Sequence, residues 1–122
     1  MNLDLITKED EENITKLTQN ERIMKYTESM KIWKKDEILQ FVKNPETSKK
    51  QVKYKITKDD KFLGIVIFGL VLVFGFYYGQ IIIPRDKNYK KNYLETVEIM
   101  KNKVKILFPK LERIHILVRT DD

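Results

Sequence analysis

The segment from Phe62 to Pro84 most constrains what this chain can fold into. It runs for 23 residues without a charged side chain, in a chain of which 34% of the residues are charged, and it contains all four glycines. A run of about 20 apolar residues is long enough to cross a bilayer as one helix. Two adjacent buried strands give the same pattern, because strands covered on both faces are apolar throughout. Taken alone, the segment leaves both interpretations open.

The residues around this segment favour strands. Val52, Tyr54 and Ile56 alternate with polar residues, which predicts a strand with one solvated face. Asp59-Asp60 then stands where a tight hairpin turn belongs, and the apolar segment follows at once. The segment itself is rich in β-branched and aromatic side chains, which fit a pleated, buried surface. We therefore predict two strands between Phe62 and Pro84, joined to the polar strand by a hairpin.

The rest of the chain predicts a single α/β domain over residues 1–122. Leu3–Ile6 alternates like a short strand, and Thr7 then precedes an acidic first turn of helix. A second helix ends at Asn44-Pro45, and a last strand is predicted from Ile114 to Val118. Apolar residues at helical spacing predict a third helix, stopped by Pro109, with the stripe Leu94, Val97, Met100, Val104 and Leu107. The predicted order is strand, two helices, three strands, a basic loop from Arg85 to Tyr93, helix and strand.

Composition narrows the classes of partner. The formal net charge of +6 favours anionic partners such as a phosphorylated cofactor, a nucleic acid or a membrane surface. Lysine and arginine are scattered through the chain, which argues against nucleic acid. The absence of cysteine excludes disulfides and thiolate metal sites, and the acidic N-terminus lacks the apolar core of a signal peptide, so we expect a cytoplasmic protein. His115 is the one histidine and cannot form a metal site alone, so no metal site is expected.

Several stretches, taken in order, resemble the GCN5-related N-acetyltransferases, the GNAT superfamily, and in particular the branch that acetylates ribosomal-protein N-termini. LITKEDEENITKL resembles the opening strand and first helix of that family, and ERIMKYT, Trp33 and EILQFV resemble the helical segment that borders the acceptor site. YKITKDDKFLGIVIFG resembles its second and third strands, with Gly64 where the family often has glycine. YYGQIIIP resembles its fourth strand and terminal proline. The resemblance rests on the order and spacing of these stretches and covers nearly the whole chain.

The resemblance implies a mixed sheet flanked by helices and a function in transferring acetyl from acetyl-CoA to a primary amine. The amine would belong to a protein N-terminus, a lysine or a small molecule. In the family, acetyl-CoA inserts beside the fourth strand and its pyrophosphate rests on the loop before the next helix. This implies a cofactor site made of Gln80, Ile81, Ile82, Ile83, Arg85, Lys87, Lys90, Lys91, Asn92 and Tyr93. The sequence identifies no catalytic acid or base.

Two departures from the family pattern open alternatives. The loop that should hold pyrophosphate has no glycine, so Arg85, Lys87, Lys90 and Lys91 would have to supply charge in place of close backbone contacts. The family also continues beyond the fifth strand with a helix and a hairpin, so we expect the C-terminal hairpin to be missing. An uncovered strand edge favours self-association as a homo-oligomer. The alternatives are an inactive GNAT-like binding module and a single-pass membrane protein spanning Phe62–Pro84.

Overall fold

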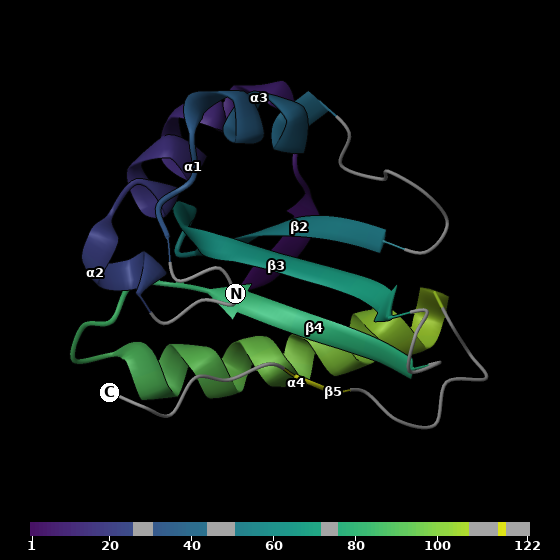
Figure 1. Ribbon diagram of the computed structural model, residues 1–122. Coiled ribbons are helices and arrows are strands. Elements are labelled where there is room, and N and C mark those ends of the chain that lie inside the picture. The colour runs from purple at the N-terminus through teal and green to yellow at the C-terminus, as the bar shows by residue number, and fades with distance from the viewer. Residues whose placement is uncertain (26–30, 44–50, 72–75, 108–114, 117–122) are drawn as a thin grey trace.

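The computed structural model describes residues 1–25, 31–43, 51–71, 76–107 and 115–116 of the chain. Its centre is one five-stranded sheet with the strand order β1-β2-β3-β4-β5 (Figure 1). Adjacent strands from β1 to β4 are antiparallel, and β5 is parallel to β4, so the predicted mixed sheet is confirmed. The strands are β1 (Asn2–Leu5), β2 (Gln51–Lys58), β3 (Lys61–Val71), β4 (Phe76–Ile82) and β5 (His115–Ile116).

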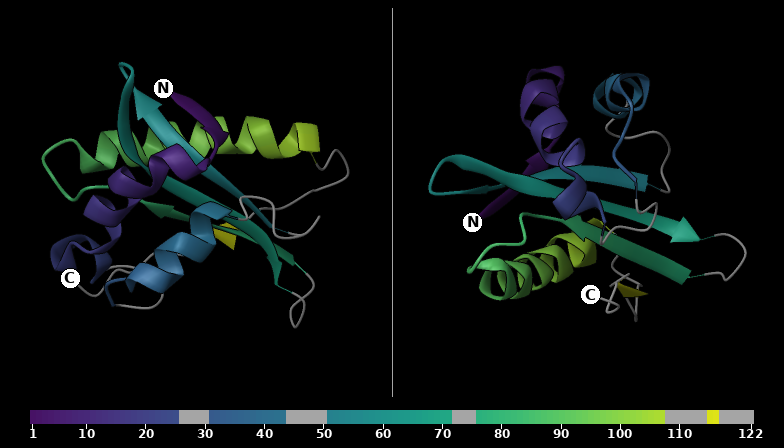
Figure 2. Two further views of the ribbon diagram at one scale, coloured as in Figure 1. Left: turned by 90° about the horizontal axis from the view of Figure 1, so that it is seen from above. Right: turned by 60° about the vertical axis from the view of Figure 1, so that its left-hand side comes forward.

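Helices cover both faces of the sheet, as predicted (Figures 1 and 2). One face carries a short 3₁₀ turn, η1, and three helices, and the other carries one long helix. Two clusters of buried side chains fill the two layers: Ile14, Ile38 and Ile65 belong to the first, and Val66, Phe68 and Met100 to the second. The elements are η1 (Lys8–Asp10), α1 (Glu11–Thr18), α2 (Glu21–Met24) and α3 (Lys35–Lys43) on the first face, and α4 (Tyr89–Leu107) on the second.

The uncharged segment forms strands. β3 continues to Val71 and β4 begins at Phe76, and the two pair in antiparallel register from Ile65 opposite Ile82 to Val71 opposite Phe76. The prediction of two strands is confirmed, and the alternative of a membrane helix over Phe62–Pro84 is wrong. Within the described part of the chain, no helix combines the length and apolar composition that crossing a bilayer requires.

The polar stretch after the first helix is more ordered than the sequence predicted. Two helices were expected before β2, and the structure adds the short helix α2 between them. The Asn20 side chain accepts a hydrogen bond from the Ile23 amide at 3.2 Å, which satisfies one of the free amides at the start of α2. A polar residue that interrupts one helix therefore caps the next. β1 also differs slightly, since it begins at Asn2 and ends at Leu5.

The prediction of a solvated face on β2 is wrong, because side chains of η1 and α3 cover it. The Lys53 side chain is only 6% exposed, and its ammonium lies 4.7 Å from the centroid of the Phe41 ring on α3. Burial lowers the pKa of Lys53. Lys55 is half-buried and donates to both carboxylate oxygens of Asp10, at 3.1 and 3.2 Å. Alternation identified the strand correctly, but long lysine side chains can lie under a helix when a ring or a carboxylate receives them.

The turn between β2 and β3 is strained. Asp59 and Asp60 have φ values of 54° and 62°, in the left-handed region that non-glycine residues seldom adopt. Two central residues with positive φ define the tight hairpin turn that matches the twist of the flanking strands. The chain therefore forms the turn that was predicted, with aspartate at two positions where asparagine and glycine are favoured.

Replacing Asp59 by Asn and Asp60 by Gly should stabilise the fold by about 1 kcal/mol, because the new residues adopt positive φ at lower cost. Thermal unfolding should then move upward by about 3–6 °C. The control carries Ala at both positions, which removes the same charges but keeps a β-carbon, and it should melt below the wild type. An Asn-Gly variant that melts no higher than the wild type contradicts this account of the turn.

Candidate functional site

The end of β4 has a sheet neighbour on one side only, within the residues that the structure describes. β3 pairs with β4 as far as Ile82, and the described residues of β5 pair with β4 at Tyr78 and Gly79. Alternate N–H and C=O groups of a strand point to opposite sides in the plane of the sheet. Part of the Gln80–Ile82 backbone therefore points away from β3, toward the side of β4 on which β5 lies.

The side chains at this end of β4 alternate between the two layers. Ile82 is buried among the α1–α3 side chains, and Ile81 and Ile83 pack on the α4 side. Gln80 shares the face of Ile82 because it lies two residues away in the same strand, and it is half-buried. The register aligns Gln80 with Ile67 and Ile67 with Lys53, so these three residues form one row across the sheet. Of the predicted site, this strand thus contributes backbone groups on the side away from β3, and Gln80 toward the first helical layer.

A close backbone contact fixes the position of the β4 end. A β-carbon on Gly64 would collide with the carbonyl oxygen of Ile82 and lie 2.7 Å from Cγ2 of Ile83. Glycine therefore lets the end of β4 approach β3 more closely than any other residue would. Gly79 also lacks room, but there the neighbour is the flexible end of Met100, at 3.0 Å.

Changing Gly64 to Ala should destabilise the fold by about 2–4 kcal/mol, because backbone atoms cannot move aside. The matched change Gly79→Ala should cost about 1 kcal/mol or less, since a methionine side chain adapts to added volume. Urea unfolding of both variants measures the difference. Equal losses of stability would show that contact with the β4 backbone is not what requires Gly64.

The loop after β4 is shorter than predicted, because α4 already begins at Tyr89. The basic loop was expected to extend to Tyr93, so its second half is the first turn of a helix. Asp86 makes this early start favourable: its carboxylate accepts a hydrogen bond from the Asn88 amide at 2.8 Å, and its carbonyl accepts one from Tyr89 at 3.1 Å. Asp-x-Asn is a turn-forming pattern that sequence reasoning could have used, and it was missed.

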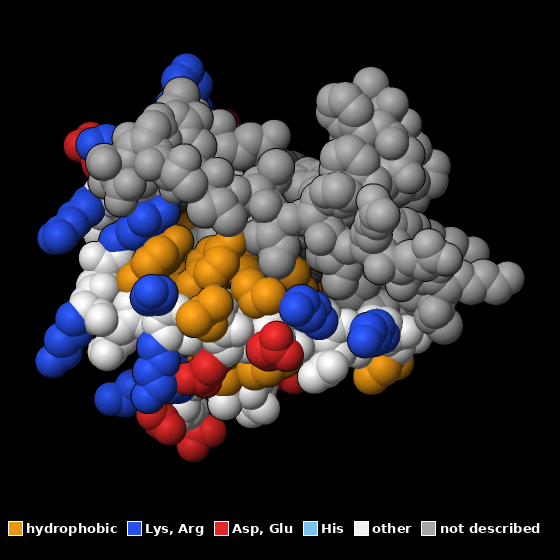
Figure 3. All heavy atoms as spheres, turned by 90° about the horizontal axis from the view of Figure 1, so that it is seen from below, with side chains coloured by type: hydrophobic (Ala, Val, Ile, Leu, Met, Phe, Trp, Pro, Cys, Tyr) orange, Lys and Arg blue, Asp and Glu red, His pale blue; other side chains and the backbone are white. Residues whose placement is uncertain are grey.

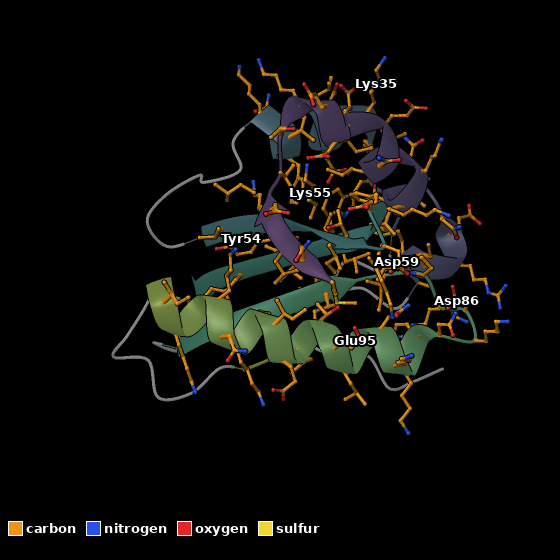
Figure 4. All side chains as sticks on the ribbon, turned by 180° about the vertical axis from the view of Figure 1, so that it is seen from behind. Lys35, Tyr54, Lys55, Asp59, Asp86 and Glu95 are labelled. Atoms are coloured by element: carbon orange, nitrogen blue, oxygen red, sulfur yellow. The ribbon has the colours of Figure 1, made fainter. Side chains whose placement is uncertain are left out.

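A polar cluster holds the first turns of α4 against the β2–β3 hairpin. The Lys58 ammonium donates to the Asn92 side-chain oxygen at 2.8 Å and to the Glu95 carboxylate at 3.1 Å. Asn92, predicted as a cofactor ligand, is only 5% exposed. Figure 4 shows that Asp59, Asp86 and Glu95 lie toward the same end of the molecule. Lys58 and Glu95 were absent from the predicted site, and no local sequence pattern pairs a strand end with a helix 34 residues later.

Two predicted site residues, Arg85 and Tyr93, form a stacked group with Tyr89 beside the loop. The Arg85 guanidinium lies 4.1 Å from the centroid of the Tyr89 ring, and the Tyr89 and Tyr93 centroids are 5.7 Å apart. The Tyr93 hydroxyl is buried without a hydrogen-bond partner in the described structure. Burial, followed by the proximity of Tyr89, raises the pKa of Tyr93 to about 12, although Arg85 acts in the opposite direction. Tyr93 therefore stays protonated well above neutral pH.

Because the folded pKa of Tyr93 lies above the unfolded value of 10, its proton is bound more tightly in the folded state. This contribution to stability is complete below pH 10 and is lost as pH rises from about 10 to 12. Tyr93→Phe should consequently lose less stability than the wild type over that range. At neutral pH the variant should be at least as stable, since it removes an unpaired buried hydroxyl. Chemical unfolding at pH 8 and pH 11 tests both statements, and a parallel pH response of the two proteins would contradict the first.

The other cationic side chains of the predicted site surround this end of α4. Lys87 lies in the loop and Lys90 and Lys91 in the first turn of the helix, and all three are exposed. Seen from below, described apolar side chains gather in one patch, with charged side chains beside and below it in the view (Figure 3). Leu94 is 58% exposed, which corrects the predicted stripe, because the helix instead buries Asn92, Thr96 and Met100 toward the sheet. The start of α4 thus carries exposed cations, while the buried face of the helix is turned to the sheet.

A separate hollow lies on the other side of the molecule. It has a volume of about 600 Å³ and is lined by side chains of η1, α1 and α3, among them Glu9, Lys16 and Lys35. No residue of the predicted cofactor site lines it. Within the described residues, no group of histidine, aspartate and glutamate side chains is arranged to hold a metal ion.

Comparisons with known proteins place the fold. No protein-family model matches the sequence, and no curated protein is significantly similar to it. Solved structures do match. A GNAT-family acetyltransferase from Bacillus anthracis matches with a TM-score of 0.66 at 18% identity. The match covers 92% of this chain and 66% of the Bacillus anthracis chain. A GNAT-family acetyltransferase from Streptococcus pneumoniae has a TM-score of 0.63 at 18% identity, covering 99% and 76%.

A third match is a ribosomal-protein-alanine N-acetyltransferase from Brucella melitensis, with a TM-score of 0.59 at 13% identity, covering 95% of this chain and 79% of its own. The chain therefore has the fold of the GNAT acetyltransferases, as the resemblance implied. It spans slightly less than two thirds of the Bacillus anthracis protein.

Proposed function

We propose that this chain binds acetyl-CoA along the end of β4 and transfers its acetyl group to a primary amine. The observation that carries the proposal is the position of Gln80–Ile82 at the end of β4, directly before the helix α4, in a GNAT fold. The outward-pointing backbone groups of these residues would pair with the pantetheine arm. The exposed cations of the loop and of the first helical turn would meet the phosphates.

The reaction that this arrangement supports is direct acyl transfer. The neutral amine nitrogen attacks the thioester carbonyl carbon, a C–N bond forms, the C–S bond breaks and the thiolate takes up the proton that the amine loses. Outward-pointing amides between Gln80 and Ile83 would stabilise the negative charge that develops on the carbonyl oxygen. A base must first remove a proton from the ammonium form of the acceptor. The acceptor class is the amine of a protein N-terminus, a lysine or a small molecule, and the Brucella melitensis protein is named for the first of these.

Calorimetric titration with acetyl-CoA tests the binding step. Replacing Lys90 and Lys91 by Ala should weaken binding by about 5- to 30-fold at low salt, because two charge-assisted contacts are lost. The effect should shrink as salt is added, since both side chains are exposed.

The matched control changes Lys101 and Lys105 to Ala. It removes the same charge from exposed positions of the same helix, about 20 Å from the first pair at 1.5 Å per residue. Binding by this control should stay close to that of the wild type. An unchanged affinity of the Lys90/Lys91 variant would mean that these lysines point into solvent and do not contact the cofactor.

A second function, a binding module without turnover, is favoured by the loop. The loop lacks glycine, and the Asp86 carboxylate takes up the Asn88 amide. Both features weaken a pyrophosphate cradle built from backbone amides. Single-turnover acetyl transfer to a panel of amines separates the two functions: binding without product at any acceptor concentration supports the module, and amide product supports the enzyme.

A further inference from the structure

Asp86 lies in the loop directly before α4 and accepts hydrogen bonds from backbone amides at the start of that helix. Its carboxylate accepts from the Asn88 amide at 2.8 Å, and its carbonyl accepts from the Tyr89 amide at 3.1 Å. The Asn92 amide donates to the carbonyl of Asn88 at 2.9 Å, so Asn88 directly precedes the first helical turn. Two backbone donors at the start of α4 are therefore bonded to atoms of the same residue.

We propose that Asp86 determines how tightly this site binds phosphate-bearing cofactors, by acting as a built-in competitor for the phosphate. The inference rests on the proposed binding of acetyl-CoA. A phosphate placed at the start of α4 would meet a like charge and would find the Asn88 amide already bonded. The residue thus counteracts the surrounding cations, Lys87, Lys90 and Lys91.

The competition is graded, because Asp86 is exposed. An exposed carboxylate can leave the Asn88 amide by rotating into water, and solvent screens its repulsion. Asp86 therefore weakens the binding of a polyanion and does not abolish it. The acetyl-pantetheine portion of the cofactor carries no phosphate, so its contribution to affinity should be independent of Asp86.

Two substitutions separate charge from hydrogen bonding. Asp86→Asn keeps a side-chain oxygen for the Asn88 amide and removes only the charge. Asp86→Ala removes both and frees the amide. We expect the dissociation constant for acetyl-CoA to fall about two- to tenfold in Asp86→Asn, and by at least as much in Asp86→Ala. Binding by both variants should also become more salt-dependent, because the net positive charge of the site rises.

Asp4→Asn is the matched charge control. Asp4 is exposed on β1, three strand spacings or about 14 Å across the sheet from β4. S-acetyl-pantetheine, which lacks phosphate, is the matched ligand control. Neither the Asp4 change with acetyl-CoA nor the Asp86 changes with S-acetyl-pantetheine should alter affinity by more than about twofold. Thermal unfolding verifies that each variant is folded.

The outcomes distinguish this inference from the function on which it rests. Tighter acetyl-CoA binding in the Asp86 variants than in the wild type supports the inference. Measurable binding by the variants supports it equally if the wild type binds too weakly to measure. Measurable binding that Asp86 does not change overturns the inference and leaves the proposed function intact. An equal gain in affinity for S-acetyl-pantetheine overturns it as well, because the effect would then not involve phosphate. No binding by any folded variant overturns both.

Discussion

Burial of β3 on both faces is the constraint on which the rest of the structure depends. Ile65 and Ile67 pack under α1 and α3, while Val66 and Phe68 pack against the layer of α4. Each of these four side chains is at most 8% exposed. A strand covered on both faces must be apolar at every position, which is why the central segment of the chain carries no charge. Because both faces of β3 are covered, the two helical layers lie on opposite sides of the sheet. The helix α4, which follows β4 in the chain, forms one of these layers.

The proposed site follows from that arrangement together with one missing β-carbon. Gly64 lets the end of β4 lie close against β3, and part of the Gln80–Ile82 backbone points to the side away from β3. The start of α4 is fixed from a third direction by Lys58, which reaches from β2 to Asn92 and Glu95. Backbone groups, not a constellation of reactive side chains, are what the fold assembles here. Such a site depends more on the accurate placement of strands than on the identity of any one residue.

The sequence predicted the elements well because their signals are local. Alternation identified β2, the uncharged run identified β3 and β4, and helical spacing identified α4. It failed where one element determines the surroundings of another. The sequence pattern predicted that Lys53 and Lys55 are solvated. In the structure Lys53 packs on the ring of Phe41, and Lys55 donates to the carboxylate of Asp10. The start of α4 was misplaced because Lys90 and Lys91 resemble loop residues, whereas the capping by Asp86 decides the boundary. Part of the predicted last strand, and the segment around Pro109, lie outside the described residues.

The long separation between β1 and its partner has a consequence for how the chain acquires this fold. β1 ends at Leu5, yet the strand with which it pairs begins at Gln51. The ion-pair partner of Asp10, Lys55, is likewise distant in the sequence. On a ribosome, where the N-terminus emerges first, η1, α1 and α3 would be synthesised long before the sheet that buries their apolar side chains. Helices of nine residues or fewer are marginal on their own in water. The nascent N-terminal third must therefore remain loosely structured, with its apolar residues accessible to chaperones, until the β2–β3 hairpin closes and provides its binding surface.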